Sequence, residues 1–250
     1  MTNFEKKLYW ELKNEEHIIQ DQWIDFRRNE YKLPDGQTIS PVYNYSKHSF
    51  SLVVATDKDG KYICVRQYRH GINEITTEFP AGGIEYAKKG EIADASSHLS
   101  QSPIQHDNDN TSDSIYKKQV IADSNTSKSS PQVKESFIGK EPITKENIIA
   151  TEEEAFEAAK RELREETGYT SDNWTHLLTI PANATISNSN VHIYCATDCT
   201  LSASQELDAT EFLNVVTLSE TELLSAINGG DFKQALHVLA YYLFKDKFRK

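Results

Sequence analysis

The chain has 250 residues, of which 38% are apolar, 10% aromatic and 26% charged. This composition supplies a hydrophobic core and excludes a wholly disordered chain, and the length allows one large domain or two small ones. The 38 acidic residues exceed the 27 basic ones and give a net charge of −11, which repels nucleic acid and argues against a general DNA or RNA binder.

The longest apolar stretches, Leu52–Ala55 and Val238–Phe244, are far shorter than the ~18 residues of a membrane span. The polar, acidic start of the chain is unlike a signal peptide. Cysteines are few and odd in number: Cys64, Cys195 and Cys199. We therefore expect a cytoplasmic protein with reduced cysteines and no membrane partner, and no metal site at the last two, which lack a second ligand pair nearby.

Residues 1–48 predict an N-terminal region of short strands, and we assign residues 49–250 to the main domain. Apolar and polar residues alternate in the first region, and Pro34-Asp-Gly36 is a turn signal between two strand candidates. The aromatic side chains of this region predict core packing or dimer contacts.

The main domain opens with two predicted strands, Phe50–Thr56 and Tyr62–Gln67, joined by a hairpin turn at Asp57–Gly60. Glu78–Gly83 (Glu-Phe-Pro-Ala-Gly-Gly) follows as a loop that bends the backbone.

Residues 86–150 differ in composition from the segments before them. The stretch is rich in Ser, Asn and Asp, and its aromatic residues are Tyr86, Tyr116 and Phe137. Little apolar area is present to offset the entropy of ordering, so we predict a long flexible insertion. An alternative is a lid that orders over substrate.

After the insertion, the sequence predicts further helices and strands. Gly168 is a C-cap signal for the first helix, Ser219 is the N-cap of the second, and Gly229-Gly230 ends the second. Leu236, Leu239 and Leu243 lie near one face of the last helix. The predicted elements are a helix at Glu152–Thr167, strands at His176–Ile180, Val191–Ala196 and Phe212–Leu218, and helices at Ser219–Asn228 and Phe232–Phe244. This order indicates a mixed α/β domain.

The first of these helices carries seven glutamates between positions 152 and 166. Glu162 and Glu166 are four residues apart and share a face, and Glu165 lies close to it. Carboxylates stacked in this way repel one another unless a cation lies among them, and their hard oxygens suit Mg²⁺ or Mn²⁺. The alternative is a solvated acidic helix with surface ion pairs.

The segment Arg161-Glu-Leu-Arg-Glu-Glu-Thr-Gly-Tyr169 resembles the second half of the Nudix hydrolase signature, Gly-x5-Glu-x7-Arg-Glu-U-x-Glu-Glu-x-Gly-U with U aliphatic or aromatic. Glu78–Glu85 is similar to the loop that opens this signature in ADP-ribose pyrophosphatases. The one departure is that residues 83–152 separate the signature's glycine, Gly82, from its glutamate, Glu153. The signature is thus split by the insertion, and Glu91 offers another register for that glutamate.

The resemblance implies a Nudix fold, with a mixed β-sheet between helices. It also implies metal-dependent hydrolysis of the pyrophosphate bond of a nucleoside-diphosphate sugar, with Mg²⁺ or Mn²⁺ as cofactor and a homodimer as the assembly. The first expected substrate is ADP-ribose, which would give AMP and ribose 5-phosphate. Alternatives are a non-catalytic nucleotide sensor and a Nudix hydrolase of NADH, dinucleoside polyphosphates or nucleoside triphosphates.

Carried over by position, the resemblance also implies site residues. The metal ligands are Glu162, Glu165, Glu166, the carbonyl of Ala81, and Glu153 in a supporting role. The catalytic residues are Glu211, which is preferred as general base, Glu206 as second choice, and Glu165. Arg69 and Glu78 bind substrate, whereas Arg161 and Gly82 are structural. The alternatives are an ion pair between Arg69 and Glu78, and solvated loop carboxylates at Glu206 and Glu211.

Overall fold

The computed structural model describes residues 5–85, 142–144 and 150–248. Residues 1–86 and 135–250 belong to one compact unit. Almost all of the predicted insertion, Glu91 included, lies outside the described residues, so its flexibility stays a prediction. In the described part of the chain, no helix combines the length and apolar character needed to cross a bilayer.

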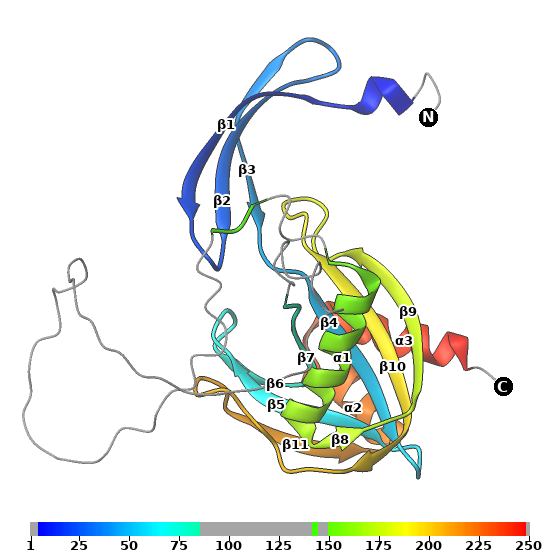
Figure 1. Cartoon of the computed structure of the whole chain (residues 1–250). Helices are drawn as coiled ribbons and strands as arrows, with labels where there is room; N and C mark the ends of the chain where they lie inside the picture. Colours follow the sequence, from blue (N-terminus) through cyan, green and yellow to red (C-terminus); the bar gives the residue numbers. More distant parts are fainter. Residues whose placement is uncertain (1–4, 86–141, 145–149, 249–250) are drawn as a thin grey trace, which may run out of the picture. The chain divides into compact units, whose positions relative to one another are not determined.

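An eight-stranded mixed sheet forms the centre of the main domain (Figure 1). Its strands are β4 (Phe50–Asp57), β5 (Tyr62–Arg69), β6 (Glu74–Glu78), β7 (Ala81–Gly83), β8 (Tyr169–Thr170), β9 (Asn173–Pro181), β10 (Asn190–Leu201) and β11 (Leu213–Leu218). The main path runs β11-β5-β4-β10-β8, with β6 beside β5, β7 beside β4 and β9 beside β10. β4 and β10 run parallel, whereas the other pairs are antiparallel.

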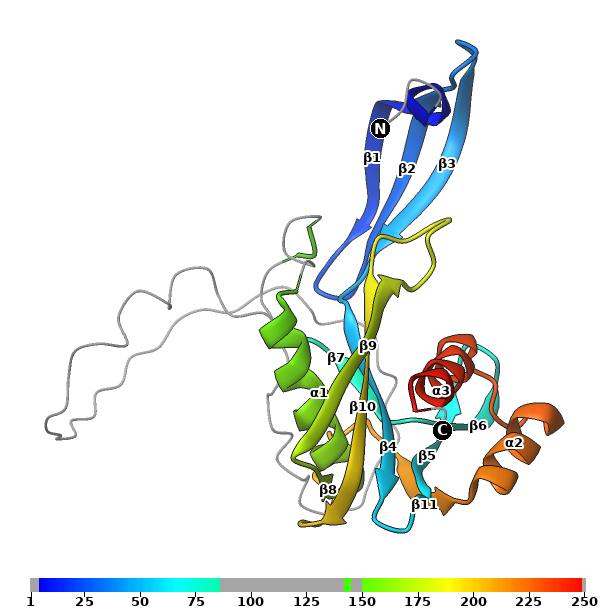
Figure 2. The same cartoon turned by 90° about the vertical axis from the view of Figure 1, so that its right-hand side faces the viewer.

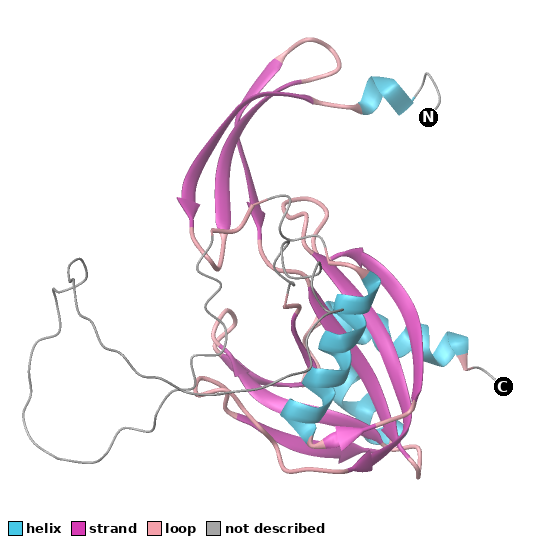
Figure 3. Cartoon of the chain, in the orientation of Figure 1, coloured by secondary structure: helices cyan, strands magenta, loops and turns pink. Residues whose placement is uncertain are grey.

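Helices cover both faces of this sheet. Helix α1 (Glu152–Thr167) lies on one face, and α2 (Glu220–Gly229) and α3 (Ala235–Lys247) lie on the other (Figure 2, Figure 3). Strand β4 shows the consequence, because its apolar run Leu52–Ala55 is fully buried along its length. Val53 packs in the cluster that includes α1, and Leu52 in the cluster that includes α2 and α3. A strand buried on both faces carries a continuous apolar run rather than an alternating one.

Helix α1 begins and ends where its local sequence predicts. The Thr151 side chain accepts a hydrogen bond from the Glu154 backbone N–H, and the Glu154 side chain accepts one from the Thr151 N–H. This capping box satisfies backbone donors of the first turn. At the other end, Gly168 adopts φ 76°, and a Cβ there would lie 2.2 Å from the carbonyl oxygen of Ala203. A side chain at this position is therefore excluded by both conformation and contact.

The N-terminal region forms its own antiparallel sheet in the order β1-β2-β3, and the turn at Pro34-Asp-Gly36 joins β2 to β3 as predicted. Its elements are a 3-10 helix at Glu5–Leu8, β1 (Glu11–Gln20), β2 (Asp25–Lys32) and β3 (Thr38–Ser46). The end of β3 is bonded to the β9–β10 loop: the Tyr45 N–H donates to the Ile186 carbonyl at 2.9 Å, and Ser46 Oγ donates to Asn188 Oδ1 at 2.8 Å.

Three short strands were not predicted: β6, β7 and β8. They lack the length and alternation that mark a strand in sequence. As a result, Glu78 ends a strand rather than opening a loop. The final helix starts at Ala235, later than predicted, and its buried residues are His237, Ala240, Tyr241 and Phe244. The three leucines expected to mark its inner face are only half-buried.

Candidate active site

The C-terminal half of α1 places its carboxylates against β7. The Glu162 and Glu166 side chains are buried, at 6% and 3% exposed. The Ala81 backbone N–H donates to Glu166 Oε2 at 3.0 Å, so β7 and α1 meet as the resemblance requires although the sequence between them is long. The Ala81 carbonyl, which was predicted as a metal ligand, belongs to the same residue.

Strand β7 approaches helix α1 so closely that position 82 must be a glycine. A Cβ at Gly82 would lie 2.1 Å from both Cδ and Oε1 of Glu162. No side chain fits at this point without displacing the carboxylate. The neighbouring Gly83 faces open space, so the constraint applies to one glycine of the pair.

Arg161 links the helix to the strand. Its Nη2 donates to the Gly83 carbonyl at 2.8 Å and lies 2.8 Å from Glu162 Oε1. Its Nη1 donates to Glu165 Oε2 at 3.0 Å. The guanidinium thus spans β7 and two carboxylates of α1.

The cluster carries more negative charge than its surroundings balance. Burial raises the pKa of Glu162 to about 7, and the Glu211 and Glu165 carboxylates act in the same direction against Arg161. Burial also raises the pKa of Glu166 well above its ordinary value, together with Glu162 and Glu211, while the Ala81 N–H and Arg69 oppose the shift. Raised pKa values of this kind mean that these carboxylates are costly to ionise unless a cation lies beside them.

Arg69 lies close enough to this cluster for Glu166 to raise its pKa, although its hydrogen bonds to Glu78 are the larger cause. Arg69 Nε donates to Glu78 Oε1 at 2.9 Å, and Nη2 donates to Oε2 at 2.5 Å. The ion pair considered as the alternative for Arg69 is therefore present. Because the Arg69 side chain remains 36% exposed, the pair does not close it off from a ligand.

The position of Glu78 does not fit the prediction that this residue binds substrate directly. Its side chain is 0% exposed, because Arg69, Thr76 and helix α3 surround it. Its partners in α3 and at the helix start, His237 and Gln234, were not identified from sequence. No local pattern distinguishes a histidine of this kind on an apolar helix face, since its partner is remote in the chain.

Of the two late-loop glutamates, Glu211 lies with the cluster. It is half-buried, and its charge raises the pKa of both Glu162 and Glu166. Its Oε2 accepts from the Asp208 N–H at 3.1 Å. Glu206 is exposed and pairs with Arg164 Nη1 at 3.2 Å. Of the two glutamates, Glu211 is therefore the one that the fold places near the buried pair.

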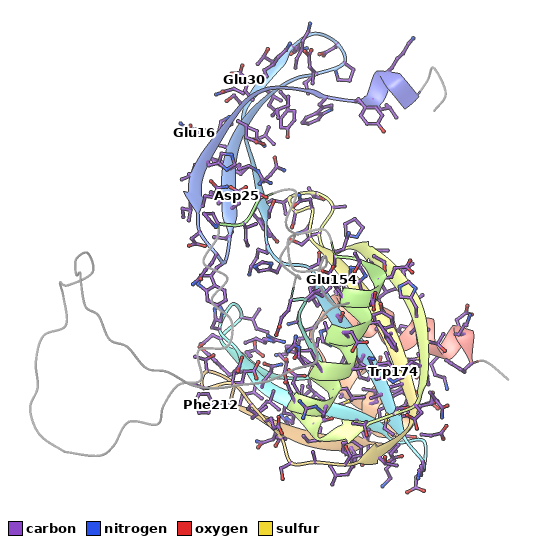
Figure 4. All side chains as sticks on the ribbon, in the orientation of Figure 1. Glu16, Asp25, Glu30, Glu154, Trp174 and Phe212 are labelled. Atoms are coloured by element: carbon purple, nitrogen blue, oxygen red, sulfur yellow. The ribbon has the colours of Figure 1, made fainter. Side chains whose placement is uncertain are left out.

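Glu165 and Glu153 hold different positions from the buried pair. Glu165 is paired with Arg161 and with Arg164, at 3.0 Å and 3.4 Å, and it shares these guanidinium groups with Glu162 and Glu206. Glu153 is exposed in the first turn of α1, beside Glu154, which Figure 4 labels at that end of the helix. Glu153 and Glu162 are nine positions apart on the helix, a rise of about 13.5 Å, so the structure does not bring Glu153 to the cluster.

The residues of the cluster fit a divalent cation by donor chemistry. Within the described ranges, no three His, Cys, Asp or Glu side chains already converge as a metal site. The available donors are instead two buried carboxylates, Glu162 and Glu166, with Glu211 nearby. Hard oxygen donors with excess negative charge match Mg²⁺ or Mn²⁺, which retain waters in their coordination shells.

Comparison with known proteins establishes the fold. No family model and no curated protein matches the sequence. The structure matches a crystal structure of an ADP compounds hydrolase with a TM-score of 0.59 and 16% identity, over 96% of this chain and 94% of that chain. At this identity the likeness concerns the fold and not the activity. It confirms the fold class predicted from sequence, a mixed α/β domain with a Nudix-like fold.

Proposed function

We propose that this chain is a metal-dependent hydrolase that cleaves the pyrophosphate bond of a nucleoside-diphosphate sugar, with ADP-ribose as the first candidate substrate. The observation that carries the proposal is the buried pair Glu162 and Glu166, whose pKa values are raised and whose neighbours include Arg69 and Glu211. A protein gains nothing in stability from two buried, mutually repelling carboxylates, so a role in binding a cation accounts for them. The fold neighbour's activity toward ADP compounds is in keeping with this substrate class.

Each residue near the pair has a task in this proposal. A bound Mg²⁺ or Mn²⁺ would supply charge neutralisation at the phosphoryl oxygens and acidify an attacking water. Glu162 and Glu166 would hold the ion, with the Ala81 carbonyl as a further oxygen. Arg69 would bind a phosphate oxygen with its exposed guanidinium edge. Glu211, the half-buried carboxylate beside the pair, would accept the proton of the water.

The direct test is a panel of substrates assayed with and without Mg²⁺ or Mn²⁺. The panel contains ADP-ribose, other nucleotide sugars, NADH, dinucleoside polyphosphates and nucleoside triphosphates, and product phosphomonoesters are detected by phosphate release with added phosphatase. We expect metal-dependent turnover with preference for ADP-ribose or another nucleotide sugar. Tight nucleotide binding without hydrolysis of any compound would instead assign the chain to nucleotide sensors.

We also propose that the chain forms a homodimer through its N-terminal sheet. Large apolar side chains of this region are exposed: Leu8, Tyr9, Trp10, Leu12, Ile18, Ile19, Trp23, Ile39 and Tyr43. We interpret these exposed apolar side chains as an interaction site. A second copy offers the same surface for self-complementary burial, and the mass in solution tests it.

A further inference from the structure

Glu78 has an unusually complete set of partners for a carboxylate that no solvent reaches. Oε1 accepts from Arg69 Nε at 2.9 Å and from Thr76 Oγ1, and Gln234 Nε2 lies 3.5 Å away. Oε2 accepts from Arg69 Nη2 at 2.5 Å. Burial raises the pKa of this carboxyl, but the hydrogen bonds from Arg69 and Thr76 oppose it, and the net shift is below the ordinary value. Glu78 therefore stays ionised inside the protein and can hold a guanidinium in a fixed orientation.

His237 approaches the same carboxylate from α3. It is 4% exposed, and burial lowers its pKa to about 4, so the ring is neutral at pH 7. Its Nδ1 lies 3.1 Å from the Phe79 backbone nitrogen and accepts that N–H. A neutral ring that accepts at Nδ1 carries its proton on Nε2. Nε2 lies 4.0 Å from Glu78 Oε2, so the N–H dipole faces the carboxylate.

Through its hydrogen bond with Phe79, His237 is connected to the segment that leads into β7. After Phe79, the Pro80 carbonyl accepts from the Val53 N–H at 2.9 Å, and the Ala81 N–H donates to Glu166. The backbone between Glu78 and Ala81 is thus fixed at each residue by a hydrogen bond. One imidazole lies between the two parts of this arrangement: its Nδ1 accepts from the loop backbone, and its Nε2 lies 4.0 Å from Glu78 Oε2.

We propose that Thr76 and His237 are positioning residues: together they orient the buried Glu78 carboxylate, which in turn holds the Arg69 guanidinium beside Glu166, ready for a phosphate group of the substrate. This inference rests on the proposed function for the identity of the ligand. It assigns Glu78 an internal role instead of a substrate contact, and it makes the C-terminal helix a determinant of substrate affinity.

Neighbouring threonines of β6 provide a matched pair of variants. Thr76 and Thr77 are both buried, at 0% and 2% exposed. The Thr76 hydroxyl donates to Glu78, whereas the Thr77 hydroxyl donates to Asp231 Oδ2 at 2.8 Å. Thr76→Val and Thr77→Val therefore remove the same group from the same strand, and only the first touches the proposed arrangement.

We expect Thr76→Val to raise the KM for ADP-ribose about tenfold, in line with the loss of a hydrogen bond to a charged group, with kcat within about twofold. Thr77→Val should leave both constants within about twofold, and Thr76→Ser, which keeps the hydroxyl, should restore the wild-type KM. Equal effects of Thr76→Val and Thr77→Val would overturn the proposal.

Two variants of His237 separate its contacts. His237→Asn keeps an acceptor for the Phe79 N–H but offers no donor at the Nε2 position, whereas His237→Leu removes both groups. The expected order of KM is wild type, then Asn, then Leu. Identical KM values for wild type and Leu would contradict a positioning role.

A measurement without substrate keeps this test independent of the proposed function. The ¹H–¹⁵N signal of Arg69 Nε, assigned by its absence in Arg69→Lys, reports the bond to Glu78. We expect hydrogen exchange at this group to be at least about tenfold faster in Thr76→Val and His237→Leu, and unchanged in Thr77→Val. If the wild type hydrolyses none of the panel, the proposed function fails, and the exchange rates still decide the positioning role: unchanged exchange in both variants overturns it.

Discussion

The main domain and the N-terminal sheet both depart from the usual rule that apolar side chains are buried and charged ones exposed, but they depart from it in opposite ways. In the main domain, α1 buries the acidic Glu162 and Glu166. In the N-terminal sheet, β1 and its approach leave the apolar Trp10 and Ile19 about half exposed. Buried charge and exposed apolar surface are the two informative departures from ordinary folding. In our proposals, the first serves to bind a cation and the second serves as a surface for a second copy of the chain.

The largest effect should come from neutralising the buried acids. Glu166→Gln or Glu162→Gln keeps the side-chain volume but removes the charge that would hold a cation. We expect kcat/KM for ADP-ribose to fall more than about 100-fold, since even groups that only orient metal ligands are worth 10–100-fold. The matched control is Glu157→Gln on the same helix, where the glutamate is exposed and pairs with Lys160. Comparable losses in all three variants would place the cation elsewhere.

The same burial predicts how the stability of the metal-free protein depends on pH. The folded pKa of Glu162 is about 7 against an ordinary value of 4.5, so between these values the folded state binds more protons than the unfolded state. The free energy of unfolding must therefore fall as pH rises from about 4.5 to 7, by roughly 3 kcal/mol for this group.

Urea unfolding of the metal-free protein at a series of pH values measures this slope. Glu162→Gln should flatten it, and saturating Mg²⁺ should reduce it because the cation binds the ionised form. A wild-type free energy of unfolding that rises through this interval and is insensitive to Glu162→Gln would show that the group is not strained by burial.

An intermediate effect is expected where β7 meets α1. Gly82→Ala places a methyl group against the Glu162 carboxyl, so either the helix or the strand must move. We expect a loss of about 1–3 kcal/mol in the free energy of unfolding, measured in urea. Gly83→Ala, which enters open space, should stay within about 0.5 kcal/mol of wild type. A harmless Gly82→Ala would mean that the two elements are not in close contact.

The smallest effect on the fold itself is expected in the N-terminal sheet. Ile19→Lys places a charge on a side chain that is 51% exposed, so the free energy of unfolding of the subunit should change by less than about 0.5 kcal/mol. Sedimentation velocity should nevertheless show a shift from dimer to monomer. Leu201→Lys, at a 67% exposed position of β10, serves as the control and should remain dimeric. A wild-type monomer would remove the basis for a dimer contact here.

Local signals in the sequence were sufficient for much of this architecture. The bounds of helix α1 were predicted from its helix-forming residues and from Gly168, which caps its C-terminal end, whereas the capping box of Thr151 and Glu154 is a finding of the structure. The acidic face of α1 followed from helical spacing. The burial of Glu78 could not be inferred in this way, because its partner His237 lies on the last helix and faces it only after the sheet has formed.

The different surroundings of the two late-loop glutamates also arise only in the folded protein. Glu206 and Glu211 occupy one loop, and the sequence resemblance implied Glu211 as the first choice of base and Glu206 as the second. Their difference arises from Arg164, which the fold brings to Glu206, and from the buried pair, which it brings close to Glu211. Spacing along the chain carries no information about either encounter.

The central claim, that the buried carboxylates of α1 exist to hold a divalent cation, is tested most directly by Mn²⁺ binding. Isothermal titration of the wild type at pH 8, compared with Glu166→Gln and Glu157→Gln, reports the affinity and the protons released. We predict saturable binding with proton release in the wild type and Glu157→Gln, and at least tenfold weaker binding in Glu166→Gln. Equal affinity in all three proteins, or no binding to the wild type, would contradict the account.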